Sequence, residues 1–138
     1  LNADLKFGAA DRTENIRRVG ETAKLFFEQG SIVLCSFVSP FRDDRRAIRA
    51  KLPDGRFFEV YGKCSLDKAV RRDPKGLDAK ARTGAIPNFT GISSPYEEPE
   101  RPELTADTEQ LSAGAIVAMV ERLLEESAVI ESRSEHRR

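Results

Sequence analysis

Residues 31–38 (SIVLCSFV) form a continuous apolar run rich in β-branched and aromatic side chains. Such a run is typical of a parallel strand that helices bury on both faces. The preceding residues 11–29 repeat apolar side chains with the 3.6-residue period of a helix, which Asp11 would cap and Gly30 would end. This apolar stripe consists of Ile16, Val19, Ala23, Phe26 and Phe27. A helix that leads directly into a buried strand predicts an α/β fold.

The rest of the chain continues the alternation of helices and strands. We expect helices over residues 40–51, 65–72, 77–82 and 112–124, and strands over 56–61 and 104–107. The inward-facing residues of the first of these helices would be Phe41, Ala47, Ile48 and Leu52. Residues 84–102 carry four of the seven prolines and are interpreted as a long functional loop. The alternating helices and strands, most of them joined by connections of a few residues, predict a layered α/β domain over residues 1–127. A charged tail follows over residues 128–138.

The composition narrows the possible partners. Lys+Arg and Asp+Glu each number 23, so no overall field attracts nucleic acid or an anionic membrane, and an anion site must be local. Two isolated cysteines, Cys35 and Cys64, are interpreted as reduced core residues of a cytoplasmic protein. The single histidine, His136, lies in the tail, which argues against histidine-based acid/base chemistry and against a His/Cys metal site.

Two short segments are candidates for binding a nucleotide. In DRTENIRR, Arg12 and Asn15 share a helix face near the N-terminus, where the helix dipole favours an anion. On spacing alone, a solvated surface with salt bridges is the commoner interpretation of this segment. In SFVSP, Val38 and Ser39 follow the predicted strand, where α/β sheets bind ligands. Ser39 also suits the N-cap of the next helix, and the two roles can coexist.

Two further segments carry cations and aromatic residues. In RRDPKG, Arg72 and Lys75 belong to a cluster of cations that is suited either to polyphosphate or to a plain solvated surface. In NFTGISSPYE, Phe89 and Tyr96 are candidates for stacking on a base, although anchoring a loop to the body is the commoner role. The residues alone leave these alternatives open.

Six segments together resemble the adenylylsulfate (APS) kinase family, in the same order and at similar spacings. They are LNADLKF, DRTENIRR, ETAKLF, SFVSPFR, RDPKGL and NFTGISSPYEEPERPEL. The resemblance covers residues 1–124. It implies a three-layer α/β/α fold of the P-loop kinase type with a parallel sheet, incomplete at its N-terminal end. It also implies transfer of the ATP γ-phosphoryl group to the 3′-hydroxyl of adenylyl sulfate, which gives PAPS for sulfate activation with the assistance of Mg²⁺.

The resemblance also implies roles for individual residues. Phe7, Arg12 and Asn15 match the residues that hold the adenylyl sulfate nucleotide, and Phe7 would supply a stacking surface. Val38 and Ser39 would contact the same substrate. Ser39 matches the family's phosphoserine position, which is a possible catalytic role, although direct transfer is the simpler mechanism.

Three more roles follow by position. Lys75 would be a catalytic cation of a lid that reaches the substrates, Arg72 would be an ATP-side cation, and Phe89 would stack on a substrate base. Two departures weaken the match near the lid, because residues 62–65 (GKCS) replace a V-D-T-P-like stretch and Asp78 replaces the usual aromatic residue.

The ATP-binding motif of the family is absent from the sequence. No G-x-x-x-x-G-K-[ST] occurs, and the acidic D-G-D-N stretch before LN is missing as well. We therefore expect the natural gene product to be longer and this fragment alone to be inactive. The alternatives are a degenerate module that binds adenylyl sulfate or PAPS without turnover, and an unrelated α/β nucleotide kinase. The expected partners are adenylyl sulfate, ATP and PAPS, together with a second copy of the chain in a homodimer or an ATP sulfurylase fused to it or associated with it.

Overall fold

The computed structural model describes residues 1–6, 8–72 and 95–131. In chain order its elements are α1 (Ala9–Glu28), α2 (Arg42–Arg49), β1 (Val60–Lys63), α3 (Leu66–Arg72), β2 (Leu104–Asp107) and α5 (Ala113–Glu126). This order of helices around parallel strands confirms the α/β class. Within these residues, no helix combines the length and the apolar character needed to cross a membrane.

The two strands pair in parallel. Val60 lies opposite Leu104, and Lys63 lies opposite Asp107. Ala106 of β2 is almost completely buried and belongs to the small apolar core. Since the strands run in the same direction, their carboxyl ends lie at the same edge of the sheet, where α/β proteins usually bind ligands.

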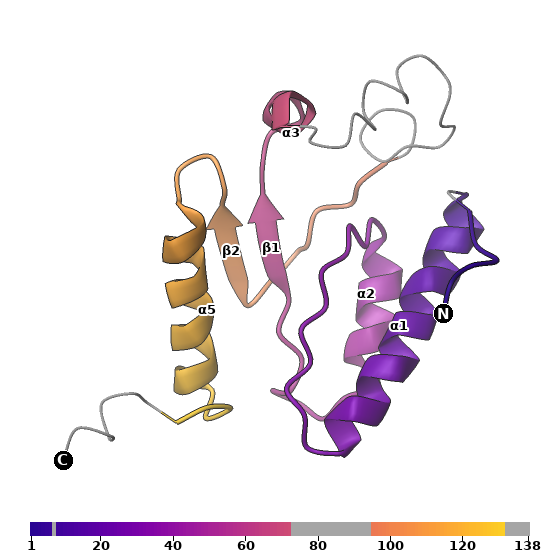
Figure 1. Ribbon diagram of the computed structural model, residues 1–138, viewed down its shortest axis with the longest axis horizontal. Helices are drawn as coiled ribbons and strands as arrows, with labels where there is room; N and C mark the ends of the chain where they lie inside the picture. Colours follow the sequence, from indigo (N-terminus) through magenta and orange to yellow (C-terminus); the bar gives the residue numbers. More distant parts are fainter. Residues whose placement is uncertain (7, 73–94, 132–138) are drawn as a thin grey trace.

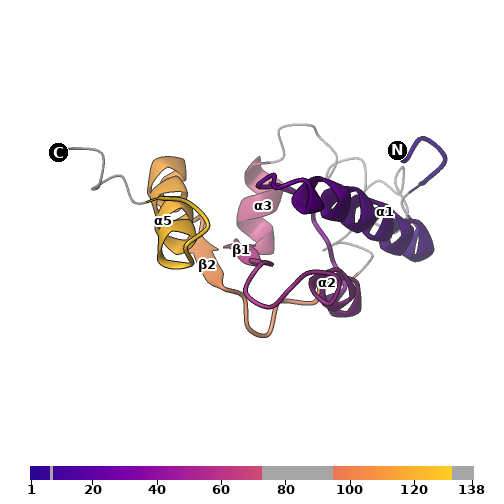
Figure 2. The same cartoon turned by 90° about the horizontal axis from the view of Figure 1, so that it is seen from below.

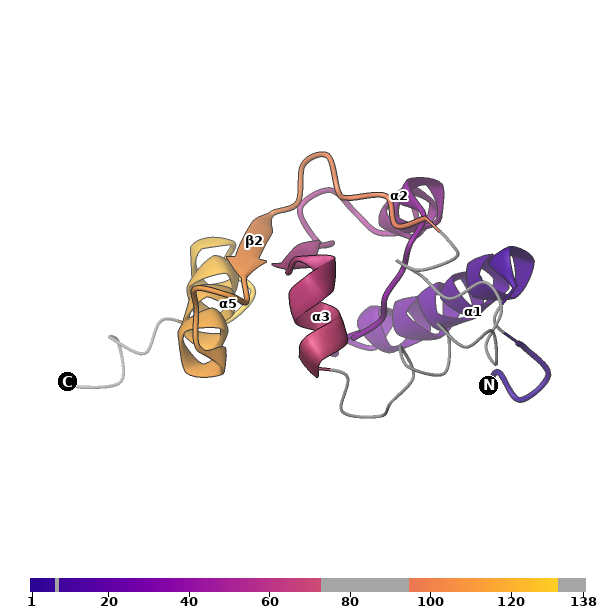
Figure 3. The same cartoon turned by 90° about the horizontal axis from the view of Figure 1, so that it is seen from above.

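The helices lie on two sides of this sheet. Figures 1 and 2 show α5 beside β2, and the pair of α1 and α2 beyond β1. Seen from above, α3 lies between α5 and α1 (Figure 3). The carboxyl ends of both strands and the N-terminal ends of α1 and α2 all lie at the upper end of the molecule in Figure 1.

The helices α1 and α2 pack together at Gly20. A Cβ added to this buried glycine would lie 2.0 Å from Cδ1 of Ile48, so the close approach depends on the absence of a side chain. Ile16 is buried one turn earlier on α1. Near the upper end, Oγ1 of Thr13 donates a hydrogen bond to Oδ2 of Asp44 at 3.0 Å. These contacts fix the position of α2 along α1.

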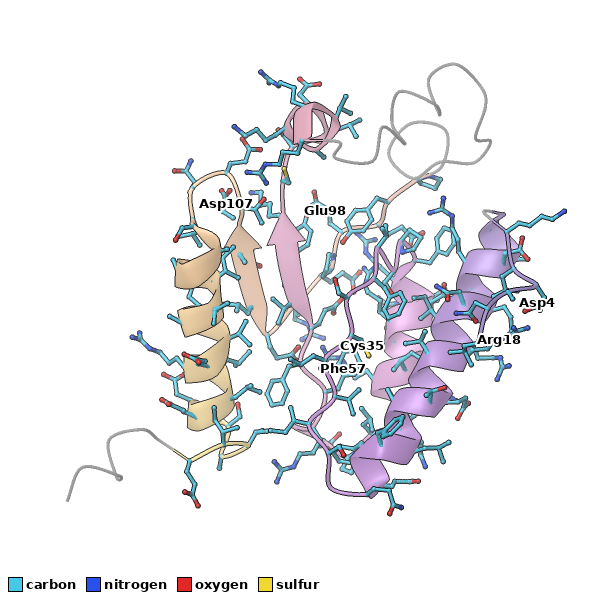
Figure 4. The ribbon with its side chains drawn as sticks, viewed as in Figure 1. Asp4, Arg18, Cys35, Phe57, Glu98 and Asp107 are labelled. Atoms are coloured by element: carbon cyan, nitrogen blue, oxygen red, sulfur yellow. The ribbon has the colours of Figure 1, made fainter. Side chains whose placement is uncertain are left out.

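The apolar run at residues 31–38 is not the buried strand that its composition predicts. Every side chain in it is exposed, with Leu34 at 84% and Val38 at 60%. The run extends between β1 and α2, with Cys35 in its course (Figure 4). Within the described part of the chain no strand pairs with it. A strand forms only where an adjacent strand offers N–H and C=O groups for hydrogen bonds. The apolar composition of a segment does not determine whether such a neighbour is present. The expectation that Cys35 is a core residue is wrong for the same reason.

The helix at the start of the chain is confirmed, with corrections at its first turn. Its N-cap is Gly8, and Asp11 lies inside the first turn. The helix ends as predicted, because Gly30 has a φ of 83° and its amide bonds to the carbonyl of Phe27 at 2.9 Å. Phe26, which was placed on the inward stripe, is exposed because this end of α1 extends past α2.

The next helix and strand are shifted from their predicted bounds. The helix α2 begins at Arg42 with Phe41 as its N-cap, so the prediction that Ser39 caps it is wrong. Ala47 is exposed, contrary to its predicted inward position. The strand β1 occupies Val60–Lys63 instead of residues 56–61, because the pairing with β2 selects its residues.

The remaining elements follow the predictions where the structure describes them. The helix α3, the strand β2 and the helix α5 are all present, and the hydroxyl of Ser112 caps α5 by accepting from the amide of Ala115 at 3.2 Å. Residues 95–102 have no regular secondary structure. The predicted helix at 77–82, the part of the predicted loop at 84–94 and the end of the tail at 132–138 lie outside the described residues.

Candidate functional site

The first two turns of α1 carry Arg12 and Asn15. Gly8, as the N-cap residue, has no side chain to cap the first turn, so this helix end favours an anion through its amides and dipole. Burial lowers the pKa of Arg12, yet a guanidinium stays charged at any physiological pH. The amide of Asn2 donates a hydrogen bond to Oδ1 of Asn15. A partly desolvated cation at a helix N-terminus is suited to a phosphate or a sulfate group.

Arg18 holds the segment before α1 against this helix. Its Nη1 and Nη2 donate to the two carboxylate oxygens of Asp4 at 2.6 and 2.8 Å, and Nη1 also donates to the carbonyl of Leu1 at 2.9 Å. Its Nε donates to Glu14 at 2.8 Å. Figure 4 shows Asp4 and Arg18 on the side of α1 away from the sheet. The bonds from Arg18 lower the pKa of Asp4 to about 2, and bonds from Arg17 and then Arg18 lower the pKa of Glu14 to about 2.

These pKa values predict an acid-sensitive attachment of the first residues. Carboxylates with lowered pKa values stabilise the folded form above their unfolded pKa values, and this contribution is lost as the pH falls toward 2. We expect Arg18→Gln to raise the pKa of Asp4 by about one to two pH units. The measurement is an NMR titration of the side-chain carboxyl carbons. Lys24→Gln, which removes an ion pair with Glu28 on the same helix, should leave Asp4 unchanged. An ordinary pKa of Asp4 in the unmodified protein would contradict the prediction.

The turn that joins the extended segment to α2 has an unusual backbone at Ser39. Its φ is 46°, which is left-handed, and it precedes the buried Pro40. This conformation costs a residue other than glycine about 1 kcal/mol or more. Val38, just before it, is exposed. The surrounding structure must therefore hold the turn in place.

A single arginine, Arg45 of α2, binds this turn and two other parts of the chain. Its Nη1 donates to the carbonyl of Ser39 at 2.5 Å, and its Nη2 donates to the carbonyl of Glu97 at 2.6 Å. Its Nε lies 2.6 Å from Oε1 of Glu59, an ion pair without hydrogen-bond alignment, since this buried oxygen has no hydrogen-bond partner. Arg45 is 9% exposed. Its three guanidinium nitrogens thus join the turn, the segment after residue 94 and the residue that precedes β1.

Tyr96 anchors the same segment to the sheet. Its ring stacks on Tyr61 of β1 with the centroids 6.2 Å apart, and Cζ of Arg45 lies 5.9 Å from the Tyr96 centroid. Burial, followed by a hydrogen bond with Glu98, raises the pKa of Tyr61 to about 12. Of the two interpretations that the sequence left open for Tyr96, these contacts favour the loop anchor.

The other arginines of α2 bind the acidic residues that follow Tyr96. Arg46 pairs with Glu100 at 2.6 Å, and Arg49 binds both carboxylate oxygens of Glu103 at 2.6 and 2.7 Å. A cavity of about 340 Å³ lies among these side chains. Because Arg45, Arg46 and Arg49 in its lining are paired with neighbouring carboxylates, the cavity belongs to the framework that holds residues 97–103 on α2.

Arg72, at the end of α3, binds the residue after β2. Its guanidinium donates to Oγ1 of Thr108 at 3.0 Å and to the carbonyl of Thr108 at 2.6 Å. These bonds hold α3 at the carboxyl edge of the sheet, and the ATP-side role of Arg72 stays a prediction. The predicted site residues Phe7, Lys75 and Phe89 lie outside the described residues.

The predicted residues of the described chain thus come from segments that lie at the same end of the molecule. Arg12 and Asn15 lie at the upper end of α1, and Val38 and Ser39 end the extended segment beside the start of α2 (Figure 1). No group of three His, Cys, Asp or Glu side chains among residues 1–6, 8–72 and 95–131 is arranged to hold a metal ion.

Arg45 was not singled out from the sequence, although a signal for it exists. Phe41, Arg45, Ile48 and Leu52 follow the spacing of one helix face. An arginine on an otherwise apolar face indicates a buried cation that needs partners. Assigning Ala47 to this face concealed the pattern.

Comparisons with known proteins agree on one family. The family model described as adenylylsulphate kinase matches residues 1–107. An adenylyl-sulfate kinase of Geotalea uraniireducens is 55% identical over 126 residues, which cover 88% of this chain and 61% of that protein. The bifunctional enzyme NodQ of Azospirillum brasilense is 56% identical over 132 residues, which cover 96% of this chain and 21% of that protein.

A solved structure agrees with these matches. The Mycobacterium tuberculosis APS kinase CysC in complex with AMPPNP and APS has a TM-score of 0.85 and 44% identity, covering 90% of this chain and 72% of that chain. The chain spans less than two thirds of the two curated relatives, 61% and 21% of their lengths.

Proposed function

This chain belongs to the adenylylsulphate kinase family, and on that basis we propose that the protein carrying it transfers the ATP γ-phosphoryl group to the 3′-hydroxyl of adenylyl sulfate. The product is PAPS. The observation that supports this most is the position of Arg12 and Asn15 at the same end of the molecule as the turn at Ser39, beside the carboxyl edge of a parallel sheet. The ligands of the similar mycobacterial kinase, AMPPNP and APS, support ATP and adenylyl sulfate as the substrates.

The described residues supply the adenylyl sulfate side of the reaction. The guanidinium of Arg12 neutralises the phosphosulfate group at the helix N-terminus, and the amide of Asn15 donates to the same nucleotide. Val38 and the backbone around Ser39 form the opposing contact. Outside the described residues, Phe7 and Phe89 would stack on the base and Lys75 would be a lid cation that reaches the substrates, as the family pattern implies. Arg72 would be a cation on the ATP side.

The reaction needs positioning more than covalent catalysis. The 3′-oxygen attacks the γ-phosphorus, the bond from that phosphorus to the β–γ bridging oxygen breaks, and the hydroxyl proton is released as ADP leaves. Holding the acceptor nucleotide in line with ATP supplies much of the rate enhancement. In this scheme Ser39 contributes its position in the turn, and the phosphoryl group passes directly between the substrates.

ATP is the phosphoryl donor, with Mg²⁺ as the ion that accompanies it. Among the described residues, no group of three His, Cys, Asp or Glu side chains is arranged to hold this ion. The match to part of a bifunctional enzyme supports fusion to an ATP sulfurylase as one natural arrangement, and a homodimer is the other. The proposed location is the cytoplasm.

The proposal is tested by measuring PAPS formation and nucleotide binding with the protein that carries this chain. We expect ATP-dependent PAPS formation, and calorimetric binding of adenylyl sulfate that is tighter than binding of AMP, which lacks the sulfate. Binding without PAPS formation would indicate the module without turnover. If neither binding nor product is found, the proposed function is wrong.

A further inference from the structure

The turn at Ser39 needs an external support. A positive φ at a serine that precedes proline is unfavourable by itself, and Ser39 does not gain the compensation of capping α2. In the described chain, a backbone bond from the amide of Glu97 to the carbonyl of Pro40, at 2.9 Å, reaches the turn from residues 95–103. The carbonyl of Ser39 itself accepts from Arg45. Two partners thus fix the conformation of the turn. One is the amide of Glu97, which lies far along the chain, and the other is the guanidinium of Arg45 on the helix α2.

The guanidinium of Arg45 is suited to this support because its nitrogens point in three directions. It binds the Ser39 carbonyl, the Glu97 carbonyl and the Glu59 carboxylate at 2.5 to 2.6 Å. Its face also lies over the ring of Tyr96. A lysine at this position keeps the charge, but its three N–H donors share one nitrogen and do not reproduce the planar fork of a guanidinium, so it cannot reach all three of these groups at the same time.

We propose that Arg45 is a positioning residue that holds the Val38–Ser39 backbone in the conformation that contacts adenylyl sulfate. This inference rests on the proposed function, since it concerns the same site. Arg45 acts through the carbonyls of Ser39 and Glu97 and does not itself touch the substrate. The other arginines of α2 do not donate to the carbonyl of Ser39. Arg46 binds Glu100, and Arg49 binds Glu103 and, at 3.7 Å, Glu59. The side chain of Arg42 donates to the carbonyl of Glu98 at 2.7 Å.

The test compares Arg45→Lys with Arg46→Lys, a matched change one position away on the same helix. We expect Arg45→Lys to lower kcat/KM for adenylyl sulfate by about 10- to 100-fold, while KM for ATP changes by less than about twofold. Arg46→Lys should leave both parameters near those of the unmodified protein. Hydrogen exchange should accelerate in residues 36–41 and at the Glu97 amide in Arg45→Lys, with exchange in α5 unchanged.

Three results would overturn the inference. They are an unchanged kcat/KM in a folded Arg45→Lys variant, an equal loss for both substrates, and unchanged exchange at the turn. If Arg45→Lys does not fold, the double variant Arg45→Gln/Glu59→Gln removes both charges together and is expected to show the same loss specific to adenylyl sulfate. Failure of the unmodified protein to bind adenylyl sulfate would refute the proposed function instead, and the exchange measurement would still decide whether Arg45 holds the turn.

Discussion

Replacing Arg12 by alanine should lower kcat/KM for adenylyl sulfate by about 10- to 100-fold, because a hydrogen bond to a charged group contributes roughly 1.5 to 3 kcal/mol. The side chain lies in the first turn of α1, where it meets the acceptor nucleotide in the proposed function. KM for ATP should stay nearly constant, since ATP binds elsewhere. Steady-state assays that vary each substrate at a saturating level of the other measure both effects.

Arg17→Ala is the matched control for this experiment. Arg17 lies on the same helix, its side chain is 55% exposed, and it pairs with Glu14. We expect its removal to change kcat/KM for either substrate by less than about twofold, as is usual for an exposed pair. Equal losses for adenylyl sulfate and ATP in Arg12→Ala would indicate a general nucleotide site and would contradict the assignment of Arg12.

The second large effect concerns stability. Glu59→Gln should lower the free energy of unfolding by roughly 2 to 3 kcal/mol, because it leaves the guanidinium of Arg45 without a charged partner in a nearly closed environment. The two side chains are 10% and 17% exposed, so solvent screens the pair only weakly. Urea unfolding followed by circular dichroism measures the change, provided that the m-value is the same in both proteins.

The same substitution at an exposed pair provides the comparison. Glu100 binds Arg46, which lies on α2 as Arg45 does, at 2.6 Å. The side chains of Glu100 and Arg46 are 55% and 59% exposed. Glu100→Gln should therefore alter the free energy of unfolding by no more than about 0.5 kcal/mol. If the two glutamine variants lose the same free energy, Glu59 is not the special counter-ion of Arg45.

Local patterns were sufficient to predict most helices. The end of α1 at Gly30, the presence of α5 and the bounds of β2 follow from rules that involve only nearby residues. The parallel α/β class followed from the order of these elements. Arg12 and Asn15 were placed on one end of α1 for the same reason.

Features that depend on distant partners were not predictable in the same way. The conformation of Ser39 depends on Arg45 and on Glu97, which lies far along the chain. The bounds of β1 depend on where β2 runs beside it. Residues 31–38 have the composition of a buried strand, but that composition does not show whether another strand lies beside them to pair with. Sequence reasoning therefore proposed residues for the candidate site but did not single out Arg45, which binds the turn at Ser39.

The absence of a side chain at Gly20 determines how closely α1 and α2 can approach each other. A methyl group there must either displace Ile48 or push α2 outward, and α2 carries Arg45. An outward shift of that helix would pull the guanidinium away from the carbonyls of Ser39 and Glu97 and loosen the turn. A residue with no functional group, on the face of α1 that meets α2, therefore limits how far Arg45 can lie from the turn at Ser39.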